Sequence, residues 1–233
     1  MRTIAIGDIH GCTKAVSALI DAIEPNQEDL LVFLGDYVDR GPDSRGTIDF
    51  LLSLENSHKT VFLRGNHEIM FSGCISEGID PIRWFQMGGL VTLISYGGRL
   101  QDVPANHLDF MARCLPYYEN DNHFFVHANY LPELPLAEQP DRTLFWEHLH
   151  QRTPGPHSSG KTAWLGHSPQ VEGNIADLGH LLCIDTFCFG GMYLTAIDVD
   201  TRQIWQADKL GNMRSAKAPE KKVRRGFWRR LNG

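Results

Sequence analysis

Acidic, amide and imidazole side chains recur along the chain in five short clusters. The clusters hold Asp8 and His10; Asp36, Asp39 and Arg40; Asn66, His67 and Glu68; His127; and His167. Mixed oxygen and imidazole ligands suit Mn²⁺, Fe or Zn²⁺ better than Ca²⁺ or Mg²⁺. A carboxylate shared by two such ions lets them lie about 3.5–4 Å apart, where they lower the pKa of a bridging water and bind a phosphoryl oxygen. If the clusters meet in space, their residue types predict metal-assisted phosphoester hydrolysis.

Each of these residues has a structural explanation when it is taken alone. Asp8 or Asp36 could cap the helix that follows it. For His67 the alternative is a different chemical role, that of a further metal ligand. The remaining histidines are explained by surface or packing positions: His58, His107, His123, His148, His150, His157 and His180. The five clusters together, in this order, favour the chemical interpretation.

The segments around the first three clusters predict an α/β fold. Buried strands are indicated by the short apolar runs 2–6, 29–36 and 59–66, and helices by the patterns at 13–23 and 44–54. The strand ends fall about thirty residues apart, which is the size of a βαβ unit. In a parallel sheet built from such units, ligands bind beyond the carboxyl ends of the strands. The first three polar clusters lie at those ends.

The second half of the chain has more β character. A second, more mixed sheet is predicted by the runs 123–128, 162–167, 180–185, 192–199 and 203–207. Residues 74–120 indicate helices and loops, and the turn-rich segment 151–161 predicts an exposed loop. We place one catalytic domain at residues 1–210 and a basic C-terminal tail at residues 211–233.

Three motifs, GDIHG (7–11), GDYVDRG (35–41) and GNHE (65–68), occur in this order. Together they resemble the signature of the phosphoprotein phosphatase family of calcineurin-like metallophosphoesterases. The sequences VHA (126–128) and GHS (166–168) extend the resemblance, which covers roughly residues 1–207. It implies an α/β fold in which two mixed β-sheets form a sandwich flanked by helices, in four α/β/β/α layers.

The resemblance also implies a role for each cluster. Asp8 and His10 would bind the first metal ion, and Asp36 would bridge both ions. The second ion would be completed by Asn66, His127 and His167. His67 would be the general acid that protonates the leaving alkoxide, and Asp39 would fix its tautomer. Arg40 would bind the phosphate in a bidentate fork. Arg64 and Glu68, which belong to the same motif, are expected to hold the loops.

This chain departs from the family's pattern at three places. Asn129 stands where Gly is usual after the His-Ala pair, and Ser168 stands where Thr is usual after Gly-His. Many members also carry a further phosphate-binding arginine between the two late histidines. In the corresponding segment, LFWEHLHQR, the candidates for that position are Glu147, His148, and the flanking Arg142 and Arg152. Which of them replaces the arginine stays open.

Composition predicts one cytoplasmic globular domain. The chain has 233 residues, of which 42% are hydrophobic, enough for a core without disulfides. The five cysteines form no CxxC pair and are expected to be reduced thiols. The sequence shows neither a signal-peptide pattern nor an apolar run near the roughly 20 residues of a membrane span.

Charge is divided unevenly along the chain. Residues 214–233 carry eight Lys or Arg and one Glu, a net charge of +7. Because the whole chain has a net charge of −6, residues 1–213 have a net charge of −13. An acidic body argues against a nucleic-acid partner. A basic tail is most often solvated, and the alternative is a weak contact with a membrane surface through Phe227 and Trp228.

These observations predict a serine/threonine protein phosphatase of the bacterial type. The stretch WFQMGGLVTLISY (84–96) resembles bacterial members and is expected to shape the substrate cleft or to be core. The reaction would be direct attack on the phosphomonoester by a hydroxide bound to two divalent metal ions, Mn²⁺ first among them. One alternative is a diadenosine tetraphosphate hydrolase, in whose family Gln is common where this chain has His10. A second is a non-catalytic phosphate-binding module.

Overall fold

The apolar runs that precede the first three polar clusters form adjacent parallel strands. In the computed structural model, which describes residues 1–214, these are β1 (Thr3–Ile6), β2 (Leu30–Phe33) and β3 (Lys59–Phe62). Helices α1 (Thr13–Ile23) and α2 (Ser44–Glu55) connect them, as the sequence predicts. The carboxyl ends of the three strands therefore lie at one edge of the sheet. The predicted basic tail lies outside the described residues from 215 onward.

Two late strands complete this sheet on its other side. β9 (Tyr193–Asp198) pairs antiparallel with β1, and β10 (Ile204–Asp208) pairs antiparallel with β9, giving the order β10-β9-β1-β2-β3. The assignment of residues 192–199 and 203–207 to the second sheet was therefore wrong. An alternating pattern predicts a strand, but it does not identify the strand's partner, since pairing is decided by packing across the whole chain.

The second sheet is mixed, as predicted. Its five strands follow the order β4 (Tyr117–Glu119), β5 (His123–Val126), β6 (Thr162–Leu165), β8 (Leu181–Cys183) and β7 (Ala176–Asp177). The three central strands β5, β6 and β8 run parallel, and the outer two are antiparallel to their neighbours. The ends of β5 and β6 carry the two late histidines, in the same way that β1 to β3 carry the early clusters.

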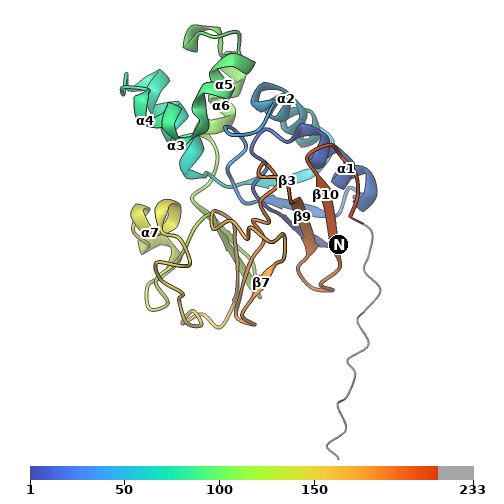
Figure 1. Ribbon diagram of the computed structural model, residues 1–233. Helices are drawn as coiled ribbons and strands as arrows, with labels where there is room; N and C mark the ends of the chain where they lie inside the picture. The colour runs from blue at the N-terminus through green and yellow to red at the C-terminus, as the bar shows by residue number, and fades with distance from the viewer. Residues whose placement is uncertain (215–233) are drawn as a thin grey trace, which may run out of the picture.

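Figure 1 shows the two sheets lying side by side. Apolar side chains from both sheets meet between them, in the middle of a sandwich. Val32 from the first sheet lies in this layer with Phe125 and Trp164 from the second, and all three are buried. Helices α1 and α2 cover the outer face of the first sheet. Leu144 and Phe145 of α7 (Asp141–Trp146) pack in the cluster on the outer face of the second. The predicted sandwich of two mixed sheets flanked by helices is confirmed.

A helical region between β3 and β4 forms the top of the molecule as drawn in Figure 1. It consists of α3 (Asn66–Ser76), α4 (Ile82–Trp84), η1 (Phe85–Gly89), α5 (Leu90–Ser95), η2 (Leu100–Asp102) and α6 (Ala105–Ala112). One more short helix, η3 (Leu136–Glu138), precedes α7. Within residues 1–214 we find no helix with both the length and the apolar character needed to cross a bilayer. All five cysteines are buried free thiols, as expected.

Candidate metal centre

The loops that follow five strands bring the predicted polar clusters together. Asp8 and His10 follow β1, Asp36 to Arg40 follow β2, and the GNHE residues follow β3 as the first turn of α3. His127 and His167 come directly or almost directly after β5 and β6. The predicted metal ligands are all buried: Asp8, His10, Asp36, Asn66, His127 and His167.

Backbone strain concentrates in these loops. Five residues of the predicted site have positive φ angles although none is glycine: His10 (46°), Asp36 (52°), Asp39 (72°), Arg40 (66°) and His167 (61°). Such conformations cost energy for residues with a Cβ and gather at active sites, where the surrounding structure holds them. These backbone conformations direct several polar side chains toward the candidate metal centre.

Two glycines allow the loops to approach this closely. A Cβ on Gly41 would lie 1.8 Å from the carbonyl oxygen of His10, and a Cβ on Gly65 would lie 2.1 Å from Asp36 Oδ1. Neither separation is compatible with a side chain. Gly41 therefore lets the GDYVDRG loop lie against the backbone of the GDIHG loop, and Gly65 lets the GNHE loop lie against the carboxylate of Asp36.

One group of donor atoms has the spacing of a metal-binding set. Asn66 Oδ1 lies 3.1 Å from His127 Nε2 and 3.0 Å from His167 Nδ1. Asp36 Oδ1 lies 3.3 Å from the same His127 nitrogen. Donors bound to one ion at about 2.1 Å are about 3.0–3.4 Å apart in a tetrahedral or octahedral shell. These four residues therefore fit the predicted second metal ion.

A second group shares Asp36. The second carboxylate oxygen of Asp36, Oδ2, lies 3.5 Å from His10 Nε2. Asp8 Oδ1 is buried and has no hydrogen-bond partner within residues 1–214, while Asp8 Oδ2 accepts a hydrogen bond from the backbone N–H of His167. A buried oxygen without a partner is costly unless a cation or water meets it. His10 and Asp36 have the spacing of ligands to the predicted first ion, and Asp36 belongs to both groups. The partnerless Asp8 oxygen suits a cation, although Asp8 is not part of either group.

Hydrogen bonds from the far side of two imidazoles fix which nitrogen faces the centre. His10 Nδ1 lies 2.8 Å from the Val38 carbonyl oxygen, and His127 Nδ1 lies 2.7 Å from that of Leu34. A carbonyl oxygen can only accept a hydrogen bond, so each ring carries its proton on Nδ1 and donates it there. Nε2 is then left with the lone pair that a metal ion needs.

The buried acids of the centre have shifted pKa values. Burial and the charge of nearby Asp185 raise the pKa of Asp8 well above its usual value. Burial also raises the pKa of Asp185 to about 7. For Asp36 burial acts in the same direction, but the surrounding histidines, His127 foremost, outweigh it and hold its pKa below the usual range. Three close carboxyl groups in one buried site call for positive charge, which divalent ions supply.

His67 and Asp39 form a buried pair beside the donor groups. His67 Nδ1 lies 2.6 Å from Asp39 Oδ2, and His67 Nε2 is buried without a partner, 3.9 Å from Asp36 Oδ2. Although burial lowers it, the carboxylates of Asp36 and Asp39 raise the pKa of His67 overall. The arrangement suits an imidazole that holds a proton on Nε2 and delivers it into the site. The same atom is also close enough to Asp36 for His67 to be grouped with a metal-binding set.

Two residues that sequence reasoning did not place in the site hold Asp39. Trp84 Nε1 donates to both carboxylate oxygens at 3.0 and 2.9 Å, and the Thr92 hydroxyl donates to Oδ1 at 2.7 Å. Both come from the stretch 84–96, which was expected to shape the substrate cleft or to be core. Trp84 is buried and packs in the core. The same side chain therefore contributes to the core and holds Asp39. Nothing in its sequence pattern identifies the partner of the indole nitrogen.

Arg40 lies at the edge of the centre. Its Nη1 is 3.0 Å from His10 Nε2, and its guanidinium carbon lies 4.9 Å from the centre of the Phe189 ring. A metal ion at His10 would use the lone pair that this guanidinium contacts. Arg40 would then have to turn away from His10, and a phosphate in the site is the group its fork-shaped donors match.

The segment of the expected late arginine contains no free arginine at the centre. Arg152 pairs with Glu147 and donates a hydrogen bond to the Tyr130 carbonyl oxygen, so it holds its own loop. His148 instead stacks on His167, with ring centres 4.1 Å apart, and its buried Nδ1 has no partner. His148 is thus a residue of this segment whose side chain touches a predicted metal ligand.

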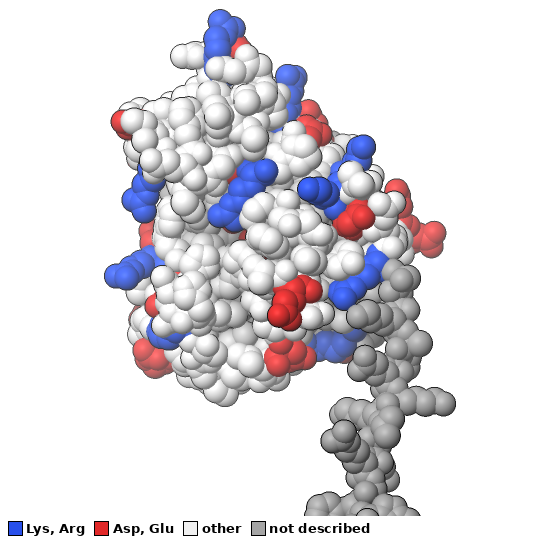
Figure 2. Space-filling model, in the orientation of Figure 1, with Lys and Arg blue, Asp and Glu red and all other residues white. Residues whose placement is uncertain are grey.

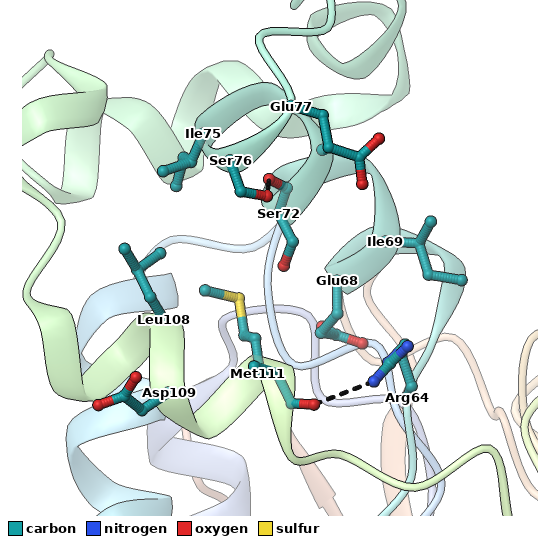
Figure 3. Close-up of a pocket in the computed structure, with 12 residues that line it drawn as sticks. Arg64, Glu68, Ile69, Ser72, Ile75, Ser76, Glu77, Leu108, Asp109 and Met111 are labelled. Atoms are coloured by element: carbon teal, nitrogen blue, oxygen red, sulfur yellow. Dashed lines mark hydrogen bonds between the residues drawn. The ribbon is translucent and has the colours of Figure 1, made fainter.

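Glu68 and Arg64 hold the loops, as expected. Glu68 accepts hydrogen bonds from the backbone N–H groups of Asp36, Tyr37, Val38 and Gly65 at 2.8–3.3 Å. Arg64 Nη2 donates to the carbonyl oxygens of Ala112 and Cys114. Figure 3 shows both side chains at the foot of α3, beside a cavity of about 410 Å³ between α3 and α6. One carboxylate therefore ties the GDYVDRG loop to the GNHE helix.

Replacing Glu68 by glutamine is expected to lower the free energy of unfolding by about 2–4 kcal/mol, because an amide nitrogen facing the buried backbone donors leaves at least one unsatisfied. Urea denaturation of the metal-free protein measures this. Glu77→Gln, at an exposed position on the C-terminal end of the same helix, is the matched control and should change stability by less than about 0.5 kcal/mol. Equal effects of the two substitutions would contradict the role given to Glu68.

Addition of Mn²⁺ is expected to raise the melting temperature. At free metal about 100 times Kd, each occupied site stabilises the native state by about 2.7 kcal/mol, or about 5–10 °C for a chain of this size. Differential scanning fluorimetry after treatment with a chelator measures the shift. A melting temperature that does not respond to Mn²⁺, Zn²⁺ or Fe²⁺ would contradict the metal assignment.

Comparison with known proteins identifies the family. The model of the calcineurin-like phosphoesterase family matches residues 1–209, so the chain belongs to that family. It is a metallophosphoesterase, a hydrolase whose family uses divalent metal ions. The resemblance carried by the five sequence motifs is confirmed.

Relatives with two different activities are similar to this chain. Serine/threonine-protein phosphatase 1 of Salmonella typhimurium is 30% identical over 209 residues, which is 82% of this chain and 88% of that protein. The symmetrical bis(5'-nucleosyl)-tetraphosphatase of Cellvibrio japonicus is 41% identical, but over 70 residues, and the match spans only 25% of its length. Among solved structures, a candidate diadenosine tetraphosphatase superposes with a TM-score of 0.67 at 22% identity, covering 88% of this chain and 92% of that one.

Proposed function

We propose that the protein is a metal-dependent serine/threonine protein phosphatase. The observation that carries the proposal is the extent of similarity to serine/threonine-protein phosphatase 1, which runs through 82% of this chain. The matches to the tetraphosphatases are shorter, at 30–36% of the chain. A match that includes both sheets includes the surroundings of the centre as well as its ligands, and those surroundings select the substrate.

The side chains around the centre can carry out the proton transfers and the charge stabilisation of phosphomonoester hydrolysis. Divalent ions held by the two donor groups would supply an activated water and neutralise phosphoryl oxygens. Arg40 would bind the phosphate with two parallel N–H donors. His67 Nε2 would protonate the departing serine or threonine oxygen, while Asp39 keeps the opposite nitrogen protonated and the ring in place.

Diadenosine tetraphosphate hydrolysis is the second candidate. It is favoured by the 41% identity to the tetraphosphatase segment and by the similarity to the solved candidate tetraphosphatase. Both reactions need the same metal ions and the same phosphate-binding arginine. The leaving group differs, because a nucleoside polyphosphate leaves as a stabilised anion and depends less on a general acid than a serine alkoxide does.

A direct comparison of substrates tests the proposal. The kcat/KM values of the Mn²⁺-loaded protein would be measured for a phosphoserine peptide, a phosphothreonine peptide and diadenosine tetraphosphate. We expect the phosphopeptides to be the better substrates. A higher value for diadenosine tetraphosphate would overturn the proposal in favour of the second candidate, and hydrolysis of none of them would favour a binding module.

The remaining details stay predictions that go with this proposal. They are Mn²⁺ as the metal ion, a cytoplasmic location, and a catalytic domain at residues 1–210 followed by the basic tail. Metal analysis of protein purified without added metal tests the first. Limited proteolysis, followed by assay of the protected fragment, tests the domain boundary.

A further inference from the structure

A groove of about 410 Å³ adjoins the candidate metal centre at Arg40. Its lining comes from four separate parts of the chain: Arg40 and Pro42 after β2, Val91 on α5, Phe189 between β8 and β9, and Lys209 and Leu210 after β10. None of the sequence motifs extends to Phe189, Lys209 or Leu210. The groove is large enough to receive several side-chain groups.

Phe189 connects the groove to the centre. Its ring lies 4.9 Å from the guanidinium carbon of Arg40 and 4.9 Å from the ring of His10. The Arg40 backbone N–H also donates to the Gly88 carbonyl oxygen at 3.1 Å, which fixes η1 and the start of α5 beside the same loop. A phosphate held by Arg40 therefore has the groove next to it, within reach of whatever group is esterified to that phosphate.

The groove combines apolar walls with one uncommitted cation. Val91, Phe189 and Leu210 supply the apolar surface, and Leu210 is 66% exposed. Lys209 is exposed, and no ion pair within residues 1–214 includes it.

The apolar surface continues from the groove onto α5. Leu90 and Ile94 of that helix are 51% and 63% exposed. Figure 2 shows a mostly uncharged surface between the charged side chains at the tip and the edges of the upper part of the molecule. An exposed apolar surface beside a catalytic site is typical of a surface that contacts a macromolecule.

This chemistry suits a peptide better than a polyphosphate. A nucleoside polyphosphate would bring several negative charges to a groove in which, among residues 1–214, Arg40 and Lys209 are the charged residues. A peptide that flanks a phosphoresidue could place one apolar side chain against Val91 and Phe189 and one carboxylate near Lys209. Charge complementarity of this kind selects among partners more than it adds affinity.

We propose that this groove, which we call the Lys209 groove, binds the peptide segment next to the phosphoserine or phosphothreonine and selects for an acidic residue there. The inference rests on the proposed protein phosphatase function. It assigns Lys209 as a specificity-determining residue outside the metal centre.

Charge reversal at Lys209 tests the inference. The substrates are phosphoserine peptides with Glu at each of three positions on either side of the phosphoresidue, each matched by a Gln peptide, together with 4-nitrophenyl phosphate. For the preferred acidic peptide, Lys209→Glu is expected to lower kcat/KM about five- to tenfold, the scale of exchanging attraction for repulsion at a partly exposed site. Hydrolysis of 4-nitrophenyl phosphate, which carries no peptide and no carboxylate, should stay unchanged.

Lys59→Glu is the matched control. Lys59 begins β3, so it lies at the opposite end of the strands from the centre, where it pairs with Glu28. This variant should behave as the wild type with every peptide. Equal Glu-over-Gln selectivity in the wild type and Lys209→Glu would overturn the inference and leave the proposed function intact. If the wild type hydrolyses diadenosine tetraphosphate but no phosphopeptide, both the proposed function and the inference fail.

Discussion

Replacing His67 by asparagine is expected to lower kcat about 10²–10⁴-fold while the protein keeps its metal ions, the range for loss of a general acid. His67 Nδ1 is held by Asp39 at 2.6 Å, and its Nε2 is buried without a partner. The loss should be larger for a phosphoserine peptide than for 4-nitrophenyl phosphate. A serine alkoxide must be protonated as it leaves, whereas nitrophenolate is stable enough to leave without a proton. Steady-state kinetics with both substrates and metal analysis of the same samples measure these quantities.

Two further variants separate the possible roles of His67. Asp39→Asn leaves the imidazole in place but weakens its contact with the carboxylate. It should reduce kcat less than His67→Asn does, with a changed pH profile. His58→Asn changes a histidine that contacts Ser57, beyond the end of α2 and away from the centre, and should leave kcat unchanged. If His67→Asn loses a metal ion, or lowers kcat equally for both substrates, then His67 is a metal ligand and the general-acid role is wrong.

The half of the fold that carries the early motifs could be predicted because its signals are local. A short apolar run followed by a helical pattern, repeated, defines β1, β2 and β3 with α1 and α2 between them. The placement of β9 and β10 could not be predicted in this way. Ile4 pairs with Asp198, almost 200 positions later in the sequence, and an alternating pattern contains no information on so distant a partner.

The same division between local and long-range signals applies to the donor atoms of the centre. Residues at the ends of parallel strands were expected to meet at one rim, and Asp36, Asn66 and His127 do so within 3.1–3.3 Å. The positive φ angles that aim these side chains could not be derived from composition or periodicity. They exist because tertiary contacts, such as those of Glu68 to the backbone of the loop, stabilise conformations that isolated residues avoid.

The residues that were missed are those whose function depends on a contact with another functional residue. Thr92 and Trp84 lie in a segment with the pattern of a core helix, and only the fold shows that both donate to Asp39. Asp185 follows β8, a strand that was predicted, yet its carboxyl group was not connected to Asp8. An available signal was the repeated occurrence of Asp directly after a buried strand, which Asp185 shares with the earlier clusters.

Asp36→Asn is expected to abolish the shared metal site and to lower kcat by at least about 10⁴-fold, because the metal ions provide both the activated water and the charge that stabilises the phosphoryl group. Among residues 1–214, Asp36 is the carboxylate common to both donor groups, 3.5 Å from His10 Nε2 through one oxygen and 3.3 Å from His127 Nε2 through the other. An amide keeps the shape but removes the negative charge, and it presents an N–H₂ group to one of the two ions. Isothermal titration with Mn²⁺ and steady-state kinetics measure the two effects.

The same substitution at Asp43 provides the control, because Asp43 caps α2 by accepting a hydrogen bond from Gly46 N and asparagine is as good a cap. Asp43→Asn should bind metal and turn over as the wild type does. High Mn²⁺ should restore part of the lost binding in Asp36→Asn, since Asn66, His127 and His167 remain as ligands of one ion. Retention of two tightly bound ions by Asp36→Asn, with activity alone lost, would show that Asp36 acts on the substrate and does not bridge the metals.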